Sequence, residues 1–416
     1  MTGRVVFIGA AGEMCRVAIE RFASADSDRE LVLTDIRPDL LKPLVERLPA
    51  GRATARHLDL FDEAALREVV RGASLVVLAA GPYIRTSDPV ITACLEEGVP
   101  YLDFDDDVES TEHALSLQEQ AEAAGIPIYV GCGASPGMSN VMAVDAASEL
   151  DSVENIDMCW LVGDERPNVG RAVMEHMLHI SAGEAVTWED GRRVVHETFV
   201  ETGRFPILAG EDDVLLYETA HPEPVTLPRR YPEARRIRCV GGLDPAPMNG
   251  LFRGVGLAIQ NGQMPQKEAV DWVFDIATGG TGLRNPGGWK HALSGMRAQI
   301  RRGESTWGLL LKFLGVSALR RTFPYKGGLL ATVYGSKDGR QTSSSRRTAL
   351  APNSAFNNMG GVTGTACAAF AVLALDDAGK RSGAFAPEDW AEPQAFYQAL
   401  ERVGVPRHQI VEVIQS

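Results

Sequence analysis

Hydrophobic positions in the first 130 residues alternate between two spacings. Short apolar runs, rich in Val, Ile and Leu, are separated by segments whose apolar residues recur at helical intervals. Strands and helices in this order predict an α/β fold built on a doubly wound parallel sheet. The predicted strands are residues 5–8, 30–35, 53–60, 74–79, 101–104 and 126–130, and helices are expected at residues 40–48, 88–96 and 110–124.

The pattern changes near residue 151. Strand-like segments continue, few helices alternate with them, and residues 337–340 (KDGR) have the composition of a hairpin turn. We therefore expect a first domain at residues 1–150 and an inserted α+β domain at residues 151–355. Residues 356–416 return to helical spacing and are expected to pack back on the first domain. A chain of 416 residues is long enough for two such cores.

Composition narrows the function classes. The net charge is −14, which argues against a nucleic-acid partner because no basic surplus is present to neutralise phosphates. The six cysteines form no CxxC pair, as is typical of a reducing compartment. No signal segment precedes the first strand, and the most apolar segments, residues 306–319 and 366–375, are shorter than a membrane span of ~18–20 residues. We expect a cytoplasmic protein that binds no membrane, although the first of these segments could lie on a membrane surface.

The first apolar run ends in a glycine turn that leads into a helix. Gly9 and Gly12 allow a sharp turn, and Ala11, Glu13 and Met14 complete it. Such a turn places free N–H groups and the positive end of the helix dipole at one spot, which suits a pyrophosphate. The turn therefore favours a Rossmann-type dinucleotide site.

The second predicted strand ends in a carboxylate. Asp35 lies 20 residues after Cys15, close to the spacing at which a dinucleotide site places an acid on the adenosine ribose. Ile36 and Arg37 follow it. Arg37 could pair with the 2′-phosphate of NADP, but Asp35 would repel that phosphate. NAD is therefore favoured, and NADP stays open.

Other strand ends meet at the same edge of the predicted sheet. Asp59 and Leu60 are expected to line the adenine. Small residues after the fourth strand let the backbone pass close to the cofactor, and these are Ala80, Gly81 and Pro82.

The segment after the sixth strand is the most specific motif. Residues 131–140 read GCGASPGMSN and lead into a helix. This segment resembles the saccharopine dehydrogenase-like oxidoreductases, which include saccharopine reductases, lysine 6-dehydrogenases and carboxynorspermidine dehydrogenases. GPY at 81–83, YLD at 101–103 and GVTGTACAA at 361–369 are similar to motifs of that family. Cys15 departs from the family pattern, and the likeness is thin across residues 165–325.

The resemblance implies a homodimer with an NAD(P)-binding first domain and an inserted domain for substrate and dimerisation. It implies hydride transfer at a carbon–nitrogen bond of a small amine or an amino-acid-derived substrate. It also places Pro136 and Gly137 beside the nicotinamide.

Four residues are candidates for proton transfer at the crevice: Tyr83, Asp103, Asp105 and Cys132. A carboxylate there could hold a cationic amine, or act as acid and base if burial raised its pKa. Alternatively, Asp105 belongs to an acidic run that caps the following helix. Cys132 is equally well explained as a small packed side chain.

Substrate contacts are expected from the inserted domain. His176 and His179 lie on one helix face, and Arg171 could clamp a carboxylate. The histidine spacing also suits a metal, but no acidic or cysteine partner lies at a ligand interval, so no metal is predicted.

Two other functions remain open. A carbonyl-reducing dehydrogenase normally uses Tyr-x-x-x-Lys, and no tyrosine in this chain has a lysine four residues later. A dinucleotide-binding scaffold or sensor without catalysis would bind the cofactor and turn over no amine.

Overall fold

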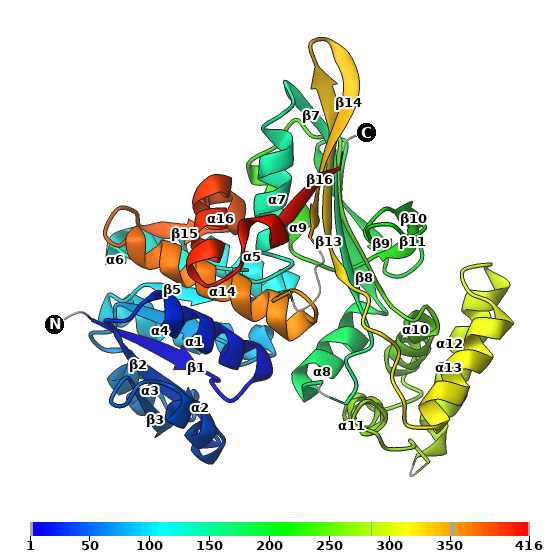
Figure 1. The fold of residues 1–416 in the computed structure, drawn as a ribbon, viewed down its shortest axis with the longest axis horizontal. Coiled ribbons are helices and arrows are strands. Elements are labelled where there is room, and N and C mark those ends of the chain that lie inside the picture. Colours follow the sequence, from blue (N-terminus) through cyan, green and yellow to red (C-terminus); the bar gives the residue numbers. More distant parts are fainter. Residues whose placement is uncertain (1–2, 168, 284, 350–353, 415–416) are drawn as a thin grey trace.

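A parallel sheet forms the core of the first lobe (Figure 1). The computed structural model describes residues 3–167, 169–283, 285–349 and 354–414. Within these residues the sheet has seven strands, all parallel, and Val6 in the central strand pairs with Val32 on one side and Val76 on the other. In spatial order the strands are β15 (Gly383–Phe385), β6 (Pro127–Tyr129), β5 (Tyr101–Asp103), β4 (Leu75–Leu78), β1 (Arg4–Ile8), β2 (Glu30–Asp35) and β3 (Ala53–His57).

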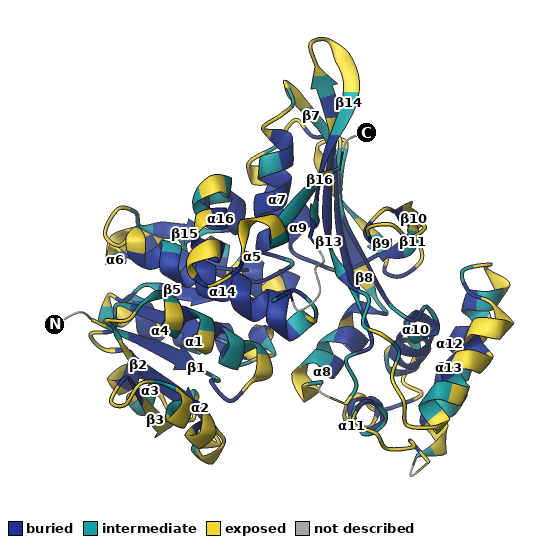
Figure 2. Cartoon of the chain, viewed as in Figure 1, coloured by how far each residue is buried: buried dark blue, intermediate teal, exposed yellow. Residues whose placement is uncertain are grey.

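Helices connect these strands and cover both faces of the sheet. The central strands are buried on both faces, because apolar residues fill every position of β1 and β4 except Arg4 (Figure 2). The connecting helices are α1 (Glu13–Ala25), η1 (Pro38–Leu41), α2 (Lys42–Arg47), α3 (Glu63–Val70), α4 (Tyr83–Glu97), α5 (Val108–Ser116), α6 (Gln118–Ala124) and α7 (Met138–Ala147).

A mixed sheet forms the second lobe and stands beside the first (Figure 1). Its β7–β12 pair is parallel and its other pairs are antiparallel. Asp338 and Gly339, both at positive φ, close the predicted hairpin. The main path is β10 (Thr202–Phe205), β11 (Val214–Glu218), β12 (Arg236–Leu243), β7 (Ser152–Val162), β13 (Gly328–Lys337), β14 (Arg340–Thr348) and β16 (Val411–Ile414), with β8 (Glu184–Glu189) and β9 (Arg192–Glu197) branching from β12.

Further helices pack below this sheet, and others form most of the C-terminal segment. The C-terminal segment serves both lobes, because β15 joins the first sheet and β16 joins the second. The helices of the second lobe are α8 (Arg171–Ile180), α9 (Glu223–Thr226), η2 (Leu227–Arg229), α10 (Pro247–Gln260), α11 (Gln266–Ala277), α12 (Pro286–Arg301) and α13 (Trp307–Ala318). Those of the C-terminal segment are α14 (Met359–Asp376), α15 (Pro387–Trp390), α16 (Pro393–Arg402) and η3 (Arg407–Gln409).

The predicted fold class is confirmed, but several element boundaries were wrong. The helix expected at residues 88–96 begins at Tyr83, directly after extended Pro82. The helix expected at 110–124 divides at Leu117, whose ψ of 17° leaves α-helical geometry. The segment at 40–48 opens with a 3₁₀ turn, and β3 ends at His57 instead of Leu60.

Helix α14 packs against α1 and is enclosed by the protein. Among the described residues it is the one helix long and apolar enough to cross a membrane, but 78% of it is buried inside the protein. Gly364 allows the close contact, since a Cβ at that position would lie 2.4 Å from the carbonyl oxygen of Met14. Helix α14 therefore packs closely against the first turn of α1.

We predict opposite effects for one substitution at two helical glycines. Gly364→Ala should lower the free energy of unfolding by about 1–3 kcal/mol, because the added methyl overpacks the α1–α14 contact. Gly315→Ala on exposed α13 meets nothing within 4 Å and should raise it by up to ~1 kcal/mol through helix propensity. Urea unfolding measures both, and equal effects would contradict the packing argument.

Candidate functional site

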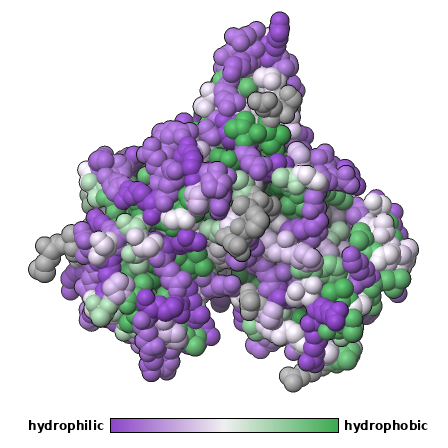
Figure 3. Space-filling view, in the orientation of Figure 1, coloured by the Kyte–Doolittle hydropathy of each residue, from purple (hydrophilic) through white to green (hydrophobic). Residues whose placement is uncertain are grey.

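A cleft of about 800 Å³ lies between the carboxyl ends of the parallel strands and the second lobe. The space-filling view shows the molecule hollowed between its two lobes (Figure 3). The first lobe contributes the glycine turn and the ends of β4 and β5, and the second lobe contributes β7 and α8. Ligands of doubly wound sheets bind at this edge, so the cleft is the candidate site.

The glycine turn forms one end of the cleft. Gly9 has a φ of +82°, and a Cβ there would lie 2.9 Å from the carbonyl carbon of Ala79. Helix α1 begins at Glu13, and its N-cap residue, Gly12, has no side chain to cap the free N–H groups. Gly12, Glu13 and Met14 line the cleft. The turn therefore fits a pyrophosphate on steric and electrostatic grounds.

Asp35 lies next to this turn and is almost fully buried. Its carboxylate accepts hydrogen bonds from the backbone N–H of Ala11 at 3.0 Å and of Arg37 at 2.9 Å. It therefore holds the glycine turn as well as the loop after β2. Ile36 and the Arg37 side chain are exposed beside it.

The remaining predicted cofactor residues lie on both sides of this edge. Asp59 is exposed and Leu60 is half-buried, beyond the end of β3. Gly81 and Pro82 line the cleft, with Ala80 half-buried next to them. Pro136 also lines the cleft.

Tyr83 faces the cleft from the first turn of α4. Its ring meets Phe104 edge-on with centroids 6.0 Å apart. Its hydroxyl is buried and has no hydrogen-bond partner among the described residues. Burial and the nearby carboxylates raise the pKa of Tyr83 well above its usual value, so the phenol stays protonated and can donate to a ligand.

Asp103 and Asp105 are fully buried behind the cleft wall. Asp103 accepts hydrogen bonds from Tyr101 Oη at 2.6 Å and from Gly131 N at 2.8 Å. Burial raises its pKa to about 6, although these hydrogen bonds oppose the rise. Asp105 accepts from Ser110 Oγ at 2.5 Å, and burial and the charge of Asp103 raise its pKa well above normal. In this position both carboxylates organise loops.

Cys132 is also fully buried. Its backbone N–H donates to the carbonyl oxygen of Asp103 at 2.7 Å. Burial raises the pKa of the thiol well above its usual value, which leaves an unreactive side chain. The catalytic roles assigned to Asp103, Asp105 and Cys132 stay predictions, and their burial gives them a packing role here.

A charged cluster does face the cleft, formed by Asp106, Asp107 and His176. His176 Nε2 lies 3.3 Å from Asp106 Oδ2, and His176 Nδ1 lies 3.3 Å from Asp107 Oδ1. Burial lowers the pKa of His176, but the two carboxylates outweigh this effect and raise it to about 9. Burial raises the pKa of Asp106, and the hydrogen bond from His176 leaves that of Asp107 below normal. From the sequence, these two aspartates are only members of the acidic run and have no predicted catalytic or binding role.

The other predicted substrate residues also line the cleft. His179 lies on the same helix as His176. Arg171 pairs with Asp271 at 2.6 Å and lies over the ring of Phe274, so its charge is already balanced.

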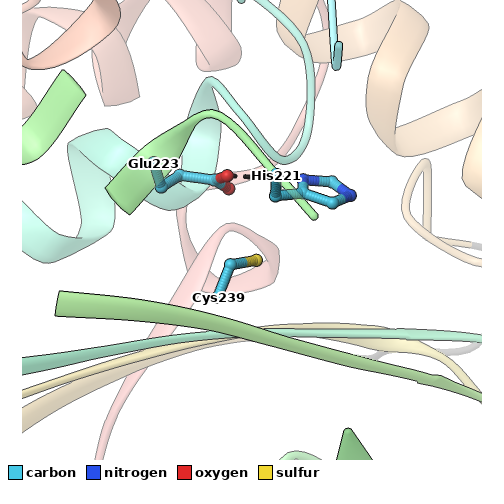
Figure 4. Close-up of side chains that lie close together, drawn as sticks. All are labelled: His221, Glu223 and Cys239. Carbon is cyan, nitrogen blue, oxygen red and sulfur yellow. Dashed lines mark ion pairs between the residues drawn. The ribbon is translucent and has the colours of Figure 1, made fainter. Parts of the chain in front are cut away.

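A second histidine–carboxylate pair was missed by the sequence motifs. His221 lines the cleft, and its Nδ1 lies 3.3 Å from Oε2 of the fully buried Glu223 (Figure 4). Burial raises the pKa of Glu223, but His221 more than offsets this effect and the pKa is lowered. The His221 ring lies tilted against Trp160 with centroids 5.5 Å apart and meets His176 edge-on at 6.0 Å. The two histidines therefore share one wall of the cleft.

Cys239 lies below this pair on β12 (Figure 4). Its sulfur and the facing atoms of His221 and Glu223 lie within 4.8 Å of one another. Burial and the Glu223 charge raise the pKa of the thiol well above normal, so Cys239 is a neutral packing group beneath His221 and Glu223.

The sequence of the first domain matches a known family. The family described as saccharopine dehydrogenase NADP binding domain matches residues 5–128, from β1 through β6. The match covers most of the first domain. The resemblance predicted from the sequence motifs is thereby confirmed for this domain.

Two curated relatives align with part of the chain. The trans-acting enoyl reductase of Mycobacterium ulcerans (strain Agy99) is 25% identical over 132 residues, 31% of this chain and 32% of that protein. The carboxyaminopropylagmatine dehydrogenase of Synechocystis sp. (strain ATCC 27184 / PCC 6803 / Kazusa) is 26% identical over 165 residues, 37% of this chain and 40% of that protein. The chain thus aligns with less than half the length of either relative.

A solved structure extends the likeness to the whole fold. Saccharopine dehydrogenase (L-Glu forming) from Saccharomyces cerevisiae superposes with a TM-score of 0.65 and covers 99% of both chains at 14% identity. The inserted mixed sheet and the C-terminal segment are therefore part of the fold that the two proteins share.

The segment of residues 131–140 joins the NADP-binding domain to the rest of the site. Gly137 has a φ of +127°, and a Cβ there would lie 2.0 Å from the carbonyl oxygen of Gly133. Ser139 Oγ donates to Glu223 at 3.3 Å, and Asn140 Nδ2 donates to Glu388 at 2.8 Å. The segment is therefore bonded to the second lobe and to the C-terminal segment.

The His176 cluster predicts a pH-dependent stability. Its folded pKa of about 9 lies above the ordinary ~6.5, so its stabilisation is complete below pH ~6.5 and is lost as pH rises through about 9. Across this window the wild type should lose about 1–3 kcal/mol of unfolding free energy that His176→Gln does not lose. Urea unfolding at several pH values measures the difference.

The matched control is His113→Gln. His113 pairs with Asp88 at 2.9 Å on the surface, where water screens the charges. Its pH profile of stability should follow that of the wild type. A His176→Gln profile parallel to the wild-type profile would contradict the charged pair.

Proposed function

We propose that the protein is an NAD(P)-dependent oxidoreductase that acts on a carbon–nitrogen bond. The observation that carries this proposal is the pair of carboxylates, Asp106 and Asp107, in the cleft that the dinucleotide turn also lines. These two carboxylates flank the His176 imidazolium, so carboxyl groups outnumber cations in the cluster where the reacting end of a substrate would lie. A cationic amine or iminium complements these carboxyl groups.

The residues present fit NAD(P). Gly9 and Gly12 allow the backbone to approach a pyrophosphate, Asp35 lies at the ribose position, and Gly81 and Pro82 border the path toward the second lobe. When bound, the cofactor accepts or supplies the hydride. The protein holds the substrate carbon against it, and the walls of the cleft exclude water.

The two histidine–carboxylate pairs have separate roles, one in binding the substrate nitrogen and the other in transferring the proton. Oxidation removes a hydride from the carbon and a proton from the nitrogen to leave a C=N bond, and reduction is the reverse. Asp106, partly exposed to the cleft, holds the cationic nitrogen. His221, held by Glu223, accepts or returns the proton, and the Tyr83 hydroxyl donates a hydrogen bond to the substrate.

The relatives support this proposal and one other. The Synechocystis relative is named as a dehydrogenase, and its name specifies an amine compound. The Mycobacterium relative is named as an enoyl reductase, and the cleft has many apolar wall residues, such as Leu161, Val173 and Val270. Reduction of a carbon–carbon double bond is therefore the second candidate function.

A substrate screen tests the proposed reaction. NAD(P)H absorbance is followed with amines and amino acids, with 2-oxo-acid and amine pairs, and with α,β-unsaturated carbonyl compounds. Turnover of the amine or imine class is expected. Turnover of the unsaturated class alone would favour the second candidate, and binding of cofactor without any turnover would favour a scaffold or sensor.

Asp106→Asn should then lower the turnover number by at least ~100-fold with the active amine. The charge that holds the cationic nitrogen is lost, while the shape of the side chain is kept. Asp88→Asn is the matched control, because Asp88 also pairs with a histidine but lies on the surface. Turnover of Asp106→Asn close to that of the control would contradict the assigned role.

We also propose that NAD is preferred over NADP. The Asp35 carboxylate would repel a 2′-phosphate, whereas exposed Arg37 would attract one. Asp35→Asn keeps an acceptor oxygen for the backbone and removes the charge, so the ratio of NADPH to NADH affinity should rise at least ~10-fold. Fluorescence titration with both cofactors measures it, and Arg37→Ala should change the ratio in the opposite direction. A ratio unchanged in Asp35→Asn would contradict the ribose assignment.

The homodimer and the cytoplasmic location expected from the sequence stay predictions.

A further inference from the structure

A second cavity, called the branch below, adjoins the cleft within the second lobe. It has a volume of about 60 Å³ and lies among β12, α10, α11 and α13. Five apolar residues line both spaces: Val162, Val169, Val173, Met177 and Met359. Because the two spaces share these side chains, the small cavity directly adjoins the cleft.

Hydrocarbon side chains form most of the wall of this branch. An apolar space of this kind stays dry and takes apolar groups. The apolar side chains that line it beyond the shared wall are Met174, Leu243, Met248, Leu251, Phe252, Val273, Ile276, Ala277 and Phe313.

The two ionisable side chains that line the branch, Arg166 and Glu165, already have hydrogen-bond partners. Arg166 donates to Asp164 at 2.7 and 2.6 Å and to Ser317 at 2.9 Å. Glu165 accepts a hydrogen bond from Met359 N, and burial raises its pKa to about 7. A charged ligand group would lose its water in the branch without gaining a partner.

The cleft therefore has a charged part and an apolar part. Asp106, Asp107 and His176 lie in the main space, whereas the branch offers hydrocarbon. We propose that the substrate carries a short uncharged aliphatic group that enters the branch while its polar end reacts in the main cleft. The nature of the polar end rests on the proposed function, and the apolar arm rests on the branch alone.

The size of the branch limits the arm. About 60 Å³ is roughly twice the ~30 Å³ share of one water, so we expect room for roughly two or three methylene groups. Each methylene buried there should raise affinity about 4-fold, the equivalent of ~0.8 kcal/mol.

A homologous series of probes tests this inference. Isothermal titration calorimetry measures the binding of primary n-alkylamines, from ethylamine to octylamine, to the protein loaded with NAD⁺. Affinity should rise about 4-fold per methylene over two or three successive members and then level off. Equal affinity along the series would overturn the proposal.

Two variants should shift the plateau in opposite directions. Ala277 lines the branch but not the main cleft, so Ala277→Phe should fill the branch and remove the chain-length gain. Phe313→Ala should enlarge it and move the plateau to longer chains. Phe323→Ala is the control, because Phe323 stacks on Phe313 but is not part of either lining. If Ala277→Phe fails to fold, Ala277→Leu takes its place, and a plateau unchanged in the filled and enlarged variants overturns the proposal.

The n-alkanols of equal length separate the two proposals. They share the apolar arm but carry no cation. A chain-length gain in both series, with no preference for amines, would support the branch and contradict the amine-binding role of Asp106. A preference for amines without any chain-length gain would support that role and contradict the branch.

Discussion

Three buried carboxylates hold the segment of residues 131–140, and the site depends on it. Asp103 accepts from the N–H at its start, Glu223 accepts from Ser139, and Glu388 accepts from Asn140. The three acids come from the first domain, the second lobe and the C-terminal segment. Burying a carboxyl group is costly unless it is hydrogen-bonded. The donors of this segment therefore stabilise the three buried acids, and the acids in turn hold the segment in place. The two lobes are thereby fixed at one point on the wall of the cleft.

This arrangement links cofactor side and substrate side. Glu223 accepts hydrogen bonds from the segment through one oxygen and pairs with His221 through the other. The wall residue Pro136 lies within the same segment. A change that loosens the segment would therefore move His221 relative to the cofactor as well as the cofactor wall itself. In the proposed reaction, this shared carboxylate would set the distance between the reacting groups.

The sequence predicted the cofactor half better than the substrate half. Strand ends of a parallel sheet meet by topology, so the turn at Gly9 and the acid at Asp35 could be placed from spacing alone. The acidic run was harder, because spacing does not show which of its members turns inward. Asp103 and Asp105 proved fully buried, while Asp106 faces the cleft. His221 reaches the cleft only through tertiary packing, so its position could not be predicted from spacing. The one weak sign of its role in the sequence is an acid two residues later, Glu223.

The proposed choice of substrate rests on the part of the chain that the family match does not cover. The match ends at residue 128, whereas every residue lining the apolar branch lies between Val162 and Met359. A likeness confined to the cofactor domain carries no information about that wall. The wall itself does, because a dry hydrocarbon space next to a charged cluster selects for ligands with one end of each kind. A substrate charged at both ends would leave one charge desolvated and unpaired in the branch.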